Sequence, residues 1–490
     1  MRRWAIGLFI VSLILRIVGL GWELLWYDEA FTALAIKLPF LDMLAALRSD
    51  VHPPLSYLIY WASSQILGRS EFALRLPSAV IGSLAVVEMY NFARKLAGEK
   101  AGRFSSALMA ILPAALYYSQ EARMYSMLSL FTLLGARAVL DRNWLRWGLC
   151  LPLLVYTHNL GAIYAAILGL GGLVPEIWKH RHFFTHPRAP ELFGIVLGSR
   201  VPIALGAGIA YLPWVPTLVH QISGMKGGFW LPLRDLSGVL YWMSFGTIFV
   251  RLPEMFLIHG IALVMALTTI SLLALRRELR SVLLLLGITF LPPLILETAS
   301  LAWRPILLDR ALVPSGVMLM GLWGTGLSRL PRWVWRPLAI IAIPMLIALI
   351  VTYYLDPTHT RAPDDPTIQI VDDHWQEQDA IYHMNAHTIV SYDYYLPGKD
   401  QYTYPEVGSL AQSMTDETKI ALGIKALEAT PSDLRERGYK RLWLMLDVSV
   451  VSTQDEIDAG KSILATHQVL RRWEIYDEPA GTFELVLIQL

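Results

Sequence analysis

Two neighbouring carboxylates, Asp28 and Glu29, follow the first apolar run of the chain and have the residue types needed for acid or base chemistry. A further acid, Glu121, stands two residues before Arg123 in a polar stretch between two apolar runs. A carboxylate can accept a proton from a reacting group, and a guanidinium can stabilise developing negative charge. These residues are therefore the first candidates for a reaction centre.

Two histidines and a second arginine also lie next to apolar runs or at their ends. His52 precedes two prolines, His158 ends an apolar run, and Arg310 lies between two such runs. Each candidate also has a structural reading. The loop acids could cap a helix, Glu121 and Arg123 could form an ion pair, the histidines could be hydrogen-bonded scaffold, and Arg310 could reach toward lipid head groups.

The elements that must position these residues are apolar. The chain of 490 residues is 55% hydrophobic and 17% charged, so a bilayer must cover most of its apolar surface. Eleven runs are long enough to cross the hydrocarbon region, which predicts an α-helical polytopic membrane protein. They lie near residues 4–21, 77–97, 103–119, 124–140, 144–158, 160–178, 192–217, 255–275, 281–301, 308–328 and 336–355.

Basic residues mark the cytoplasmic ends of membrane helices, and here they alternate correctly if the N-terminus is cytoplasmic. That alternation requires residues 53–68 to lie along the interface as an amphipathic helix rather than to cross. The loops at residues 22–76 and 218–254 then share the extracytoplasmic side with the tail. All the candidate residues map to that face, and this convergence favours a functional site.

Charge divides the chain near Asp356. Residues 1–355 carry 30 basic and 17 acidic side chains, whereas residues 356–490 carry 11 and 23. We therefore predict a membrane domain over residues 1–355 and a small extracytoplasmic α/β domain over 356–490. The expected strands lie in 380–390, 441–446 and 483–490, and the expected helices in 416–429 and 453–467.

Four short motifs carry a resemblance to a known family. They are Asp28-Glu29, the His-Pro-Pro-Leu element at residues 52–55, the Arg-Leu-Pro-Ser element at 75–78, and the run Tyr-Ser-Gln-Glu-Ala-Arg-Met-Tyr-Ser at 118–126. In their order and spacing they resemble the polytopic GT-C glycosyltransferases, especially protein O-mannosyltransferases and bacterial lipid A aminoarabinose transferases. The resemblance covers about residues 1–330 and is best over 22–160.

The resemblance implies a glycosyltransferase that moves a sugar from a polyprenyl phosphate carrier to an acceptor outside the cytoplasm. It makes Asp28 the general base, with Glu29 beside it and Glu121 as a second acid, and it places His52 where the family has a basic phosphate contact, often a lysine. We expect a single displacement that inverts the anomeric centre. The expected substrate-binding residues are His52, Tyr118, Arg123, Tyr125, His158 and Arg310.

The expected partners are the lipid-linked donor, a lipid, glycan or protein acceptor and membrane lipids, without nucleic acid. No cofactor is required, although a divalent ion between Asp28 and Glu121 stays open. The expected location is a prokaryotic plasma membrane. Two other classes compete: a transporter or flippase of lipid-linked sugars, although no paired repeats are evident, and a non-catalytic membrane scaffold.

The positive-inside pattern predicts that the C-terminus is extracytoplasmic. A reporter fused after Leu490 should be labelled only from the extracytoplasmic side of intact cells or oriented vesicles. A reporter fused before the first apolar run serves as the control for the opposite side. Labelling of the Leu490 reporter from the cytoplasm would overturn this topology.

Overall fold

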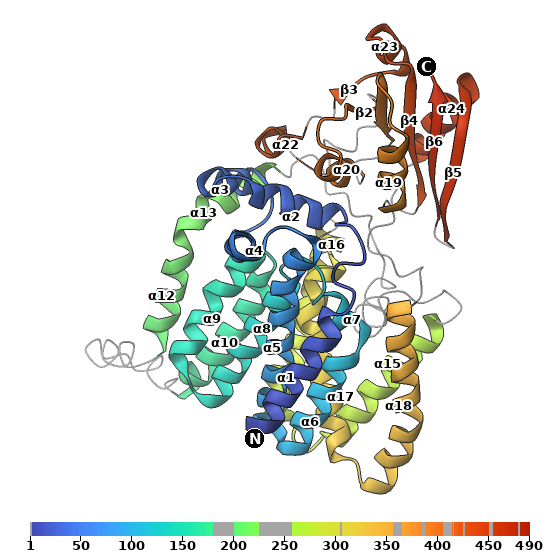
Figure 1. Cartoon of the computed structure of the whole chain (residues 1–490). Helices are drawn as coiled ribbons and strands as arrows, with labels where there is room; N and C mark the ends of the chain where they lie inside the picture. Colours follow the sequence, from blue (N-terminus) through green and yellow to red (C-terminus); the bar gives the residue numbers. More distant parts are fainter. Residues whose placement is uncertain are drawn as a thin grey trace.

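The computed structural model describes most of the chain and joins a large bundle of helices to a smaller domain that contains a β-sheet (Figure 1). The described residues are 2–179, 200–224, 257–303, 306–355, 365–384, 388–404, 414, 416–424, 427–449, 454–478 and 481–490. The N-terminus lies at one end of the bundle, and the C-terminal domain sits beyond the opposite end (Figure 1).

The bundle begins with a long helix and three shorter ones. These are α1 (Arg2–Ile17), α2 (Tyr27–Lys37), α3 (Phe40–Ser49) and α4 (Leu55–Leu67). The predicted interfacial segment at residues 53–68 is thus helical, as α4. Its mixed composition explains its position, because one face packs against α2 and α5 while Ile66, at 84% exposure, faces outward.

The remaining helices of the bundle are α5 (Glu71–Ala97), α6 (Glu99–Ile111), α7 (Pro113–Tyr117), α8 (Tyr125–Asp141), α9 (Trp144–Thr157), α10 (Gly161–Lys179), α12 (Val201–Tyr211), α13 (Val215–Gly224), α15 (Leu257–Ala274), α16 (Leu279–Ala302), α17 (Val313–Arg329) and α18 (Arg332–Leu355), with the 3-10 turns η2 (Leu212–Trp214) and η6 (Asp309–Leu312). Local sequence sets several ends. The Ser70 side chain caps α5 by accepting from Ala73 N. Gly98, with a φ of 95°, ends that helix, and Pro113 starts α7.

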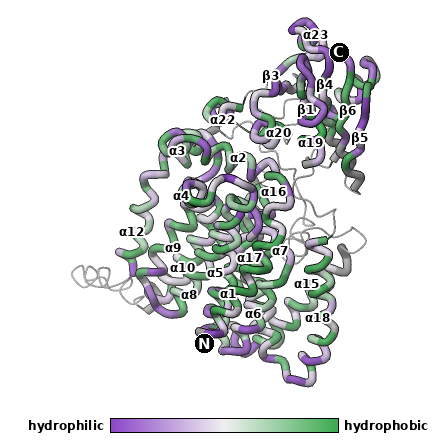
Figure 2. Tube along the Cα trace, viewed as in Figure 1, coloured by the Kyte–Doolittle hydropathy of each residue, from purple (hydrophilic) through white to green (hydrophobic). Residues whose placement is uncertain are grey.

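Each of the eleven predicted apolar runs contains a helix in its described part. Figure 2 shows hydrophobic residues dominating these helices. Within the described residues, four helical stretches are both long and apolar enough to cross a membrane: Glu71–Ala97, Val201–Ser223, Val282–Ala302 and Asp309–Arg329. The helices are therefore confirmed, while eleven crossings, like the direction of the termini, stay a prediction.

Close helix contacts hold the middle of the bundle together. Helix α17 is almost fully buried and packs against α6, α15 and α16. Two glycines permit this approach, because a Cβ on Gly324 would lie 2.3 Å from Ser105 N of α6 and one on Gly326 would lie 2.5 Å from Ser271 Cα of α15. Small residues at helix crossings let backbones approach closely in membrane proteins.

The C-terminal domain is built on a six-stranded mixed sheet in the order β3-β2-β1-β4-β6-β5. Its strands are β1 (Asp379–His383), β2 (Gln401–Thr403), β3 (Leu427–Glu428), β4 (Arg441–Ser449), β5 (Gln468–Glu478) and β6 (Gly481–Gln489). Its helices are α19 (Asp365–His374), α20 (Ile389–Tyr395), α22 (Asp416–Leu422), α23 (Pro431–Glu436) and α24 (Gln454–Thr466). Strands β1 to β4 pair in parallel, whereas β6 runs antiparallel to both β4 and β5.

The α/β architecture expected for this tail is observed, with corrections to its elements. The expected strand at 380–390 ends at His383, and residues 389–395 form helix α20. The expected helix at 416–429 ends at Leu422, and Leu427–Glu428 pair as β3 instead. Short apolar runs have no decisive period, so the tertiary neighbours select helix or strand. The predicted boundary at Asp356 lies outside the described residues.

The C-terminal domain rests on the helices of the first loop. The Tyr395 hydroxyl accepts a hydrogen bond from Leu25 N (2.8 Å) and donates to Glu71 Oε1 (2.8 Å). Lys37 lies 3.8 Å from the ring centre of Tyr394, a cation–π contact. Buried residues of α2 and α20 also belong to one hydrophobic cluster. The domain thus covers the end of the bundle that holds Asp28 and its neighbours.

The glycine contact between α17 and α6 should be essential for stability. Gly324→Ala places a Cβ against the α6 backbone, which cannot yield like a side chain, so we expect a loss of about 1–3 kcal/mol from overpacking. Gly208→Ala is the matched control, because a Cβ there meets nothing within 4 Å. Thermal unfolding of both variants in the same lipid nanodiscs measures the difference. Equal unfolding temperatures would contradict this account.

Candidate functional site

Asp28 and Glu29 occupy the first turn of α2, at the end of the bundle that the C-terminal domain covers. Both are buried, at 8% and 0% exposure. Adjacent positions on a helix point in different directions. The two acids therefore meet different partners, and this difference separates their chemistry.

Glu29 is held by Arg75 of α5 in a two-pronged ion pair. Arg75 donates from Nε to Oε1 (2.9 Å) and from NH2 to Oε2 (2.6 Å), and neither side chain has any exposed surface. Arg75 also donates to three backbone carbonyls within residues 20–24. Glu29 Oε1 in addition accepts from Ala122 N (2.7 Å). The pair thus ties two loop segments to α2 and α5, and the Glu29 carboxylate is occupied.

Asp28 instead lies beside two arginines from distant parts of the sequence. Its Oδ2 atom is 2.5 Å from Arg310 NH1 and 3.8 Å from Arg123 Nε. Arg310 belongs to the 3-10 turn η6, and Arg123 belongs to the segment between α7 and α8. Two cations stabilise the ionised form of a carboxylate. The site therefore presents an anionic oxygen between two guanidinium groups.

Arg123 is fixed by several further contacts. It donates to the Asp28 carbonyl (3.2 Å), to the Tyr57 hydroxyl (3.2 Å) and to His52 Nε2 (2.9 Å). Burial is the largest single influence and opposes the charge of Arg123, but Asp28, Tyr57 and Tyr125 together outweigh it, so the pKa of Arg123 lies well above its usual value. Burial also raises the pKa of the Tyr57 hydroxyl. Arg123 thus stays charged and Tyr57 stays neutral.

Glu121 lies on another side of the same site. It is 1% exposed and interacts electrostatically with Tyr118, Tyr125 and Arg310. The rings of Tyr118 and Tyr125 form an edge contact with centroids 5.4 Å apart. Glu121 and Asp28 therefore both place a carboxyl group near Arg310, and Tyr118 and Tyr125 lie beside them.

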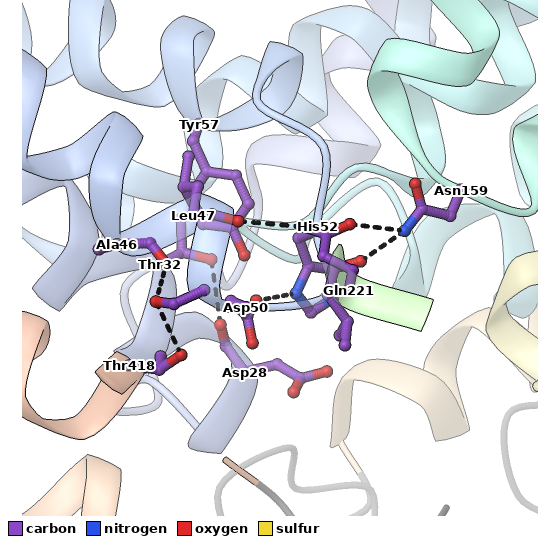
Figure 3. Close-up of polar contacts among 12 residues, drawn as sticks. Asp28, Thr32, Ala46, Leu47, Asp50, His52, Tyr57, Asn159, Gln221 and Thr418 are labelled. Carbon is purple, nitrogen blue, oxygen red and sulfur yellow. Dashed lines mark hydrogen bonds and ion pairs between the residues drawn. The ribbon is translucent and has the colours of Figure 1, made fainter. Parts of the chain in front are cut away.

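His158 is the C-cap residue of α9 and lies near Tyr125. Its Nδ1 accepts a hydrogen bond from Leu160 N (3.0 Å), and its ring lies 6.4 Å from that of Tyr125. The neighbouring Asn159 donates to Val51 O (2.8 Å) on the loop that carries His52 (Figure 3). His158 therefore lies beside Tyr125, and one of its ring nitrogens is occupied by a backbone N–H just beyond α9.

The structure thus brings together all nine residues that the sequence singled out. Asp28, His52, Arg123 and Arg310 form a continuous chain of polar contacts. The others, Tyr118, Glu121, Tyr125 and His158, lie beside them, whereas Glu29 is turned into the pair with Arg75.

Sequence reasoning missed the role of Arg75, which entered only as part of a motif. Its signal was available, because an arginine close to an apolar run requires a buried partner. Tyr57 gave no signal, since tyrosines are common at membrane interfaces.

The donor set around Asp28 does not resemble a divalent cation site. Such ions take several oxygen ligands, whereas the Asp28 carboxylate faces two guanidinium groups. In the part of the chain that the structure describes, no cluster of three or more His, Cys, Asp or Glu residues has the arrangement for a metal. A divalent ion between Asp28 and Glu121 stays a prediction.

Comparison with known proteins places this arrangement in context. Residues 51–197 match the sequence model of the dolichyl-phosphate-mannose-protein mannosyltransferase family. The structure of ArnT from Cupriavidus metallidurans without ligand is similar, with a TM-score of 0.61, 14% identity, and coverage of 100% of this chain and 98% of that one. The structure of the same protein bound to undecaprenyl phosphate gives a TM-score of 0.56 and 14% identity over 99% of this chain and 98% of that one. No curated protein sequence matches the chain.

The chain has the GT-C fold. The fold that this resemblance implies is therefore confirmed by a structural similarity that spans the whole chain, although only 14% of the aligned residues are identical. Within this fold, all four motifs meet at one place: Arg75 binds Glu29, and Arg123 lies between Asp28 and His52. The fold joins the motifs because their polar groups satisfy one another in a buried setting.

The Glu29–Arg75 pair should hold the candidate site together. Arg75→Ala leaves the Glu29 charge buried and unpaired, so we expect a loss of about 3–5 kcal/mol. The matched control is Arg329→Ala, because Arg329 pairs with Glu278 at 37% exposure on both sides, where such pairs contribute up to about 1 kcal/mol. Thermal unfolding in nanodiscs measures both variants. Equal losses would contradict a special role for the buried pair.

Proposed function

We propose that the protein is a glycosyltransferase that moves a sugar from a polyprenyl phosphate carrier to a hydroxyl group of an acceptor. The observation that carries this proposal is the buried Asp28 carboxylate between the guanidinium groups of Arg310 and Arg123. The reaction needs a base for the hydroxyl and cations for the departing phosphate, and both are within a few ångströms here.

The fold supports the donor class. One of the similar GT-C structures is described as ArnT bound to undecaprenyl phosphate. A lipid phosphate carried by this protein would find its cations in Arg310 and Arg123. Negative charge on the leaving phosphate grows as the bond to the sugar breaks, so preformed guanidinium groups stabilise the transition state more than the ground state.

The proposed reaction is a single displacement. The acceptor oxygen attacks the anomeric carbon, and its proton passes to the Asp28 carboxylate. The bond between the anomeric carbon and the phosphate oxygen breaks, and the electron pair leaves with the lipid phosphate. A single displacement inverts the anomeric centre. The groups that this displacement requires lie around Asp28. The reaction forms no covalent intermediate with the protein.

The other acids have different proposed roles. Glu29 is a positioning residue, because Arg75 and Ala122 N occupy its carboxylate. Glu121 balances the charge of Arg310 and stands next to the tyrosines. Tyr118, Tyr125 and His158 then contact the substrates. This assigns base chemistry to Asp28 alone, although the sequence singled out three acids.

The proposed site faces the extracytoplasmic side of a prokaryotic plasma membrane. Its position under the C-terminal domain supports this side, since the predicted topology places that domain outside the cytoplasm (Figure 1). The acceptor is a lipid, a glycan or a protein that reaches the site from that side.

The test is transfer from a panel of polyprenyl phosphate sugars by purified protein in nanodiscs. Asp28→Asn should lower turnover by about 100-fold or more, because the amide cannot accept the hydroxyl proton. Glu121→Gln should also reduce transfer. The control is Asp42→Asn, an exposed acid on α3, which should leave the rate unchanged.

Two outcomes would contradict the proposal. Near-normal turnover by a stably folded Asp28→Asn variant would remove Asp28 as the base. Donor binding without turnover by the wild type, across a range of acceptors, would favour the transporter reading instead.

A further inference from the structure

His52 is part of a linear chain of polar contacts that ends at Asp28. Its Nδ1 atom lies 2.5 Å from Asp50 Oδ2, and its Nε2 atom lies 2.9 Å from Arg123 NH2. Arg123 in turn contacts Asp28 through its side chain at 3.8 Å and through the Asp28 carbonyl at 3.2 Å. Figure 3 shows Asp50, His52 and Asp28 gathered in this region.

The partners of His52 determine where its proton lies. A guanidinium group has only donors, so Arg123 NH2 must donate and His52 Nε2 must accept. The remaining ring proton is then on Nδ1 and is donated to the Asp50 carboxylate. In this state the imidazole is neutral, and both of its nitrogens are occupied within the protein. It presents no free donor to a phosphate.

The segment that carries Asp50 and His52 is held from three directions. Asn159 donates to the backbone of residues 47–51 at Val51 O (2.8 Å), and Gln221 of α13 donates to Leu47 O (3.1 Å). From the C-terminal domain, the Thr418 hydroxyl donates to the Ser49 hydroxyl at 3.1 Å (Figure 3). Elements far apart in sequence thus fix the backbone beneath His52.

Aromatic neighbours fix the plane of the imidazole ring. The rings of Phe31 and Tyr57 each have their centroids 6.1 Å from that of His52. The Tyr57 hydroxyl also accepts from Arg123 at 3.2 Å, so the same residue contacts both members of the His52–Arg123 contact. The imidazole ring of His52 therefore has aromatic neighbours in addition to the polar partners of its two nitrogens.

From these contacts we infer that His52, oriented by Asp50, is a positioning residue that holds the Arg123 guanidinium against Asp28. This inference rests on the proposed function and differs from the family resemblance, which makes the same position a direct phosphate contact. A neutral histidine accepts from the arginine, whereas the lysine common in the family could only donate and would repel it.

Two substitutions separate the two roles. Glutamine can place its side-chain oxygen where Nε2 lies and accept from Arg123, so His52→Gln should retain transfer within a few fold. Lysine brings a like charge toward Arg123, so His52→Lys should lose about 100-fold, the size of effect that a displacement of about 1 Å can cause. A phosphate contact predicts the reverse order, because lysine binds phosphate and glutamine carries no charge.

The Asp50 link has its own test. Asp50→Asn keeps an oxygen that can accept from Nδ1–H and should remain close to wild type, whereas Asp50→Ala frees the ring and should lower transfer about 10-fold or more. Asp42→Ala is the matched control, since Asp42 is an exposed acid on the neighbouring helix α3. Equal activity of Asp50→Ala and Asp42→Ala would overturn the role of Asp50.

Thermal unfolding in nanodiscs tests the same contact without transfer. His52→Lys should unfold at a lower temperature than His52→Gln, and this order should disappear in an Arg123→Met background. The inference is overturned if His52→Lys equals or exceeds His52→Gln in both transfer and unfolding temperature. Absence of transfer by the wild type would overturn the proposed function instead, while the unfolding comparison would still decide how His52 and Arg123 interact.

Discussion

The buried pair of Glu29 and Arg75 is the interaction on which the rest of the site depends. Isolated charges without exposed surface are too costly to persist, so each requires the other and every remaining hydrogen-bonding atom needs a partner. Arg75 satisfies this demand with loop carbonyls of residues 20–24, and Glu29 does so with Ala122 N. The first loop and the segment before α8 are thereby fixed on α5.

This constraint explains how Asp28 can serve a different purpose from its neighbour. With Glu29 anchored, the first turn of α2 presents the Asp28 side chain toward Arg123 and Arg310. Arg123 is in turn held by His52 and Tyr57, which belong to separate elements. Rigid support of this kind is what a site for group transfer requires, because small displacements of charged groups are costly to the rate.

The C-terminal domain also helps to fix the segments around Asp28. Tyr395 contacts Leu25 and Glu71 on either side of the α2 to α4 region, and Thr418 contacts the segment that leads to Asp50. These are specific hydrogen bonds within a shared hydrophobic cluster. The C-terminal domain is therefore part of the structure around the site.

The sequence by itself determined the helical membrane class, the position of the helices and the set of polar residues that belong together. Apolar runs of membrane length, and the charges that interrupt them, can be read along the chain. They do not depend on which elements pack together. It also predicted the α/β class of the tail, but not that residues 389–395 turn helical or that 427–428 join the sheet. These choices depend on packing against other elements, which a short apolar run does not encode.

Only the tertiary structure decided the partners of each charged group. Glu29 and Asp28 are adjacent carboxylates whose partners the sequence does not reveal, yet Arg75 occupies one while two arginines flank the other. His52 similarly changes from an expected phosphate contact to an acceptor for Arg123. Partners that lie dozens to hundreds of residues apart make these distinctions, because the chemistry of a buried ionisable group is set by what surrounds it.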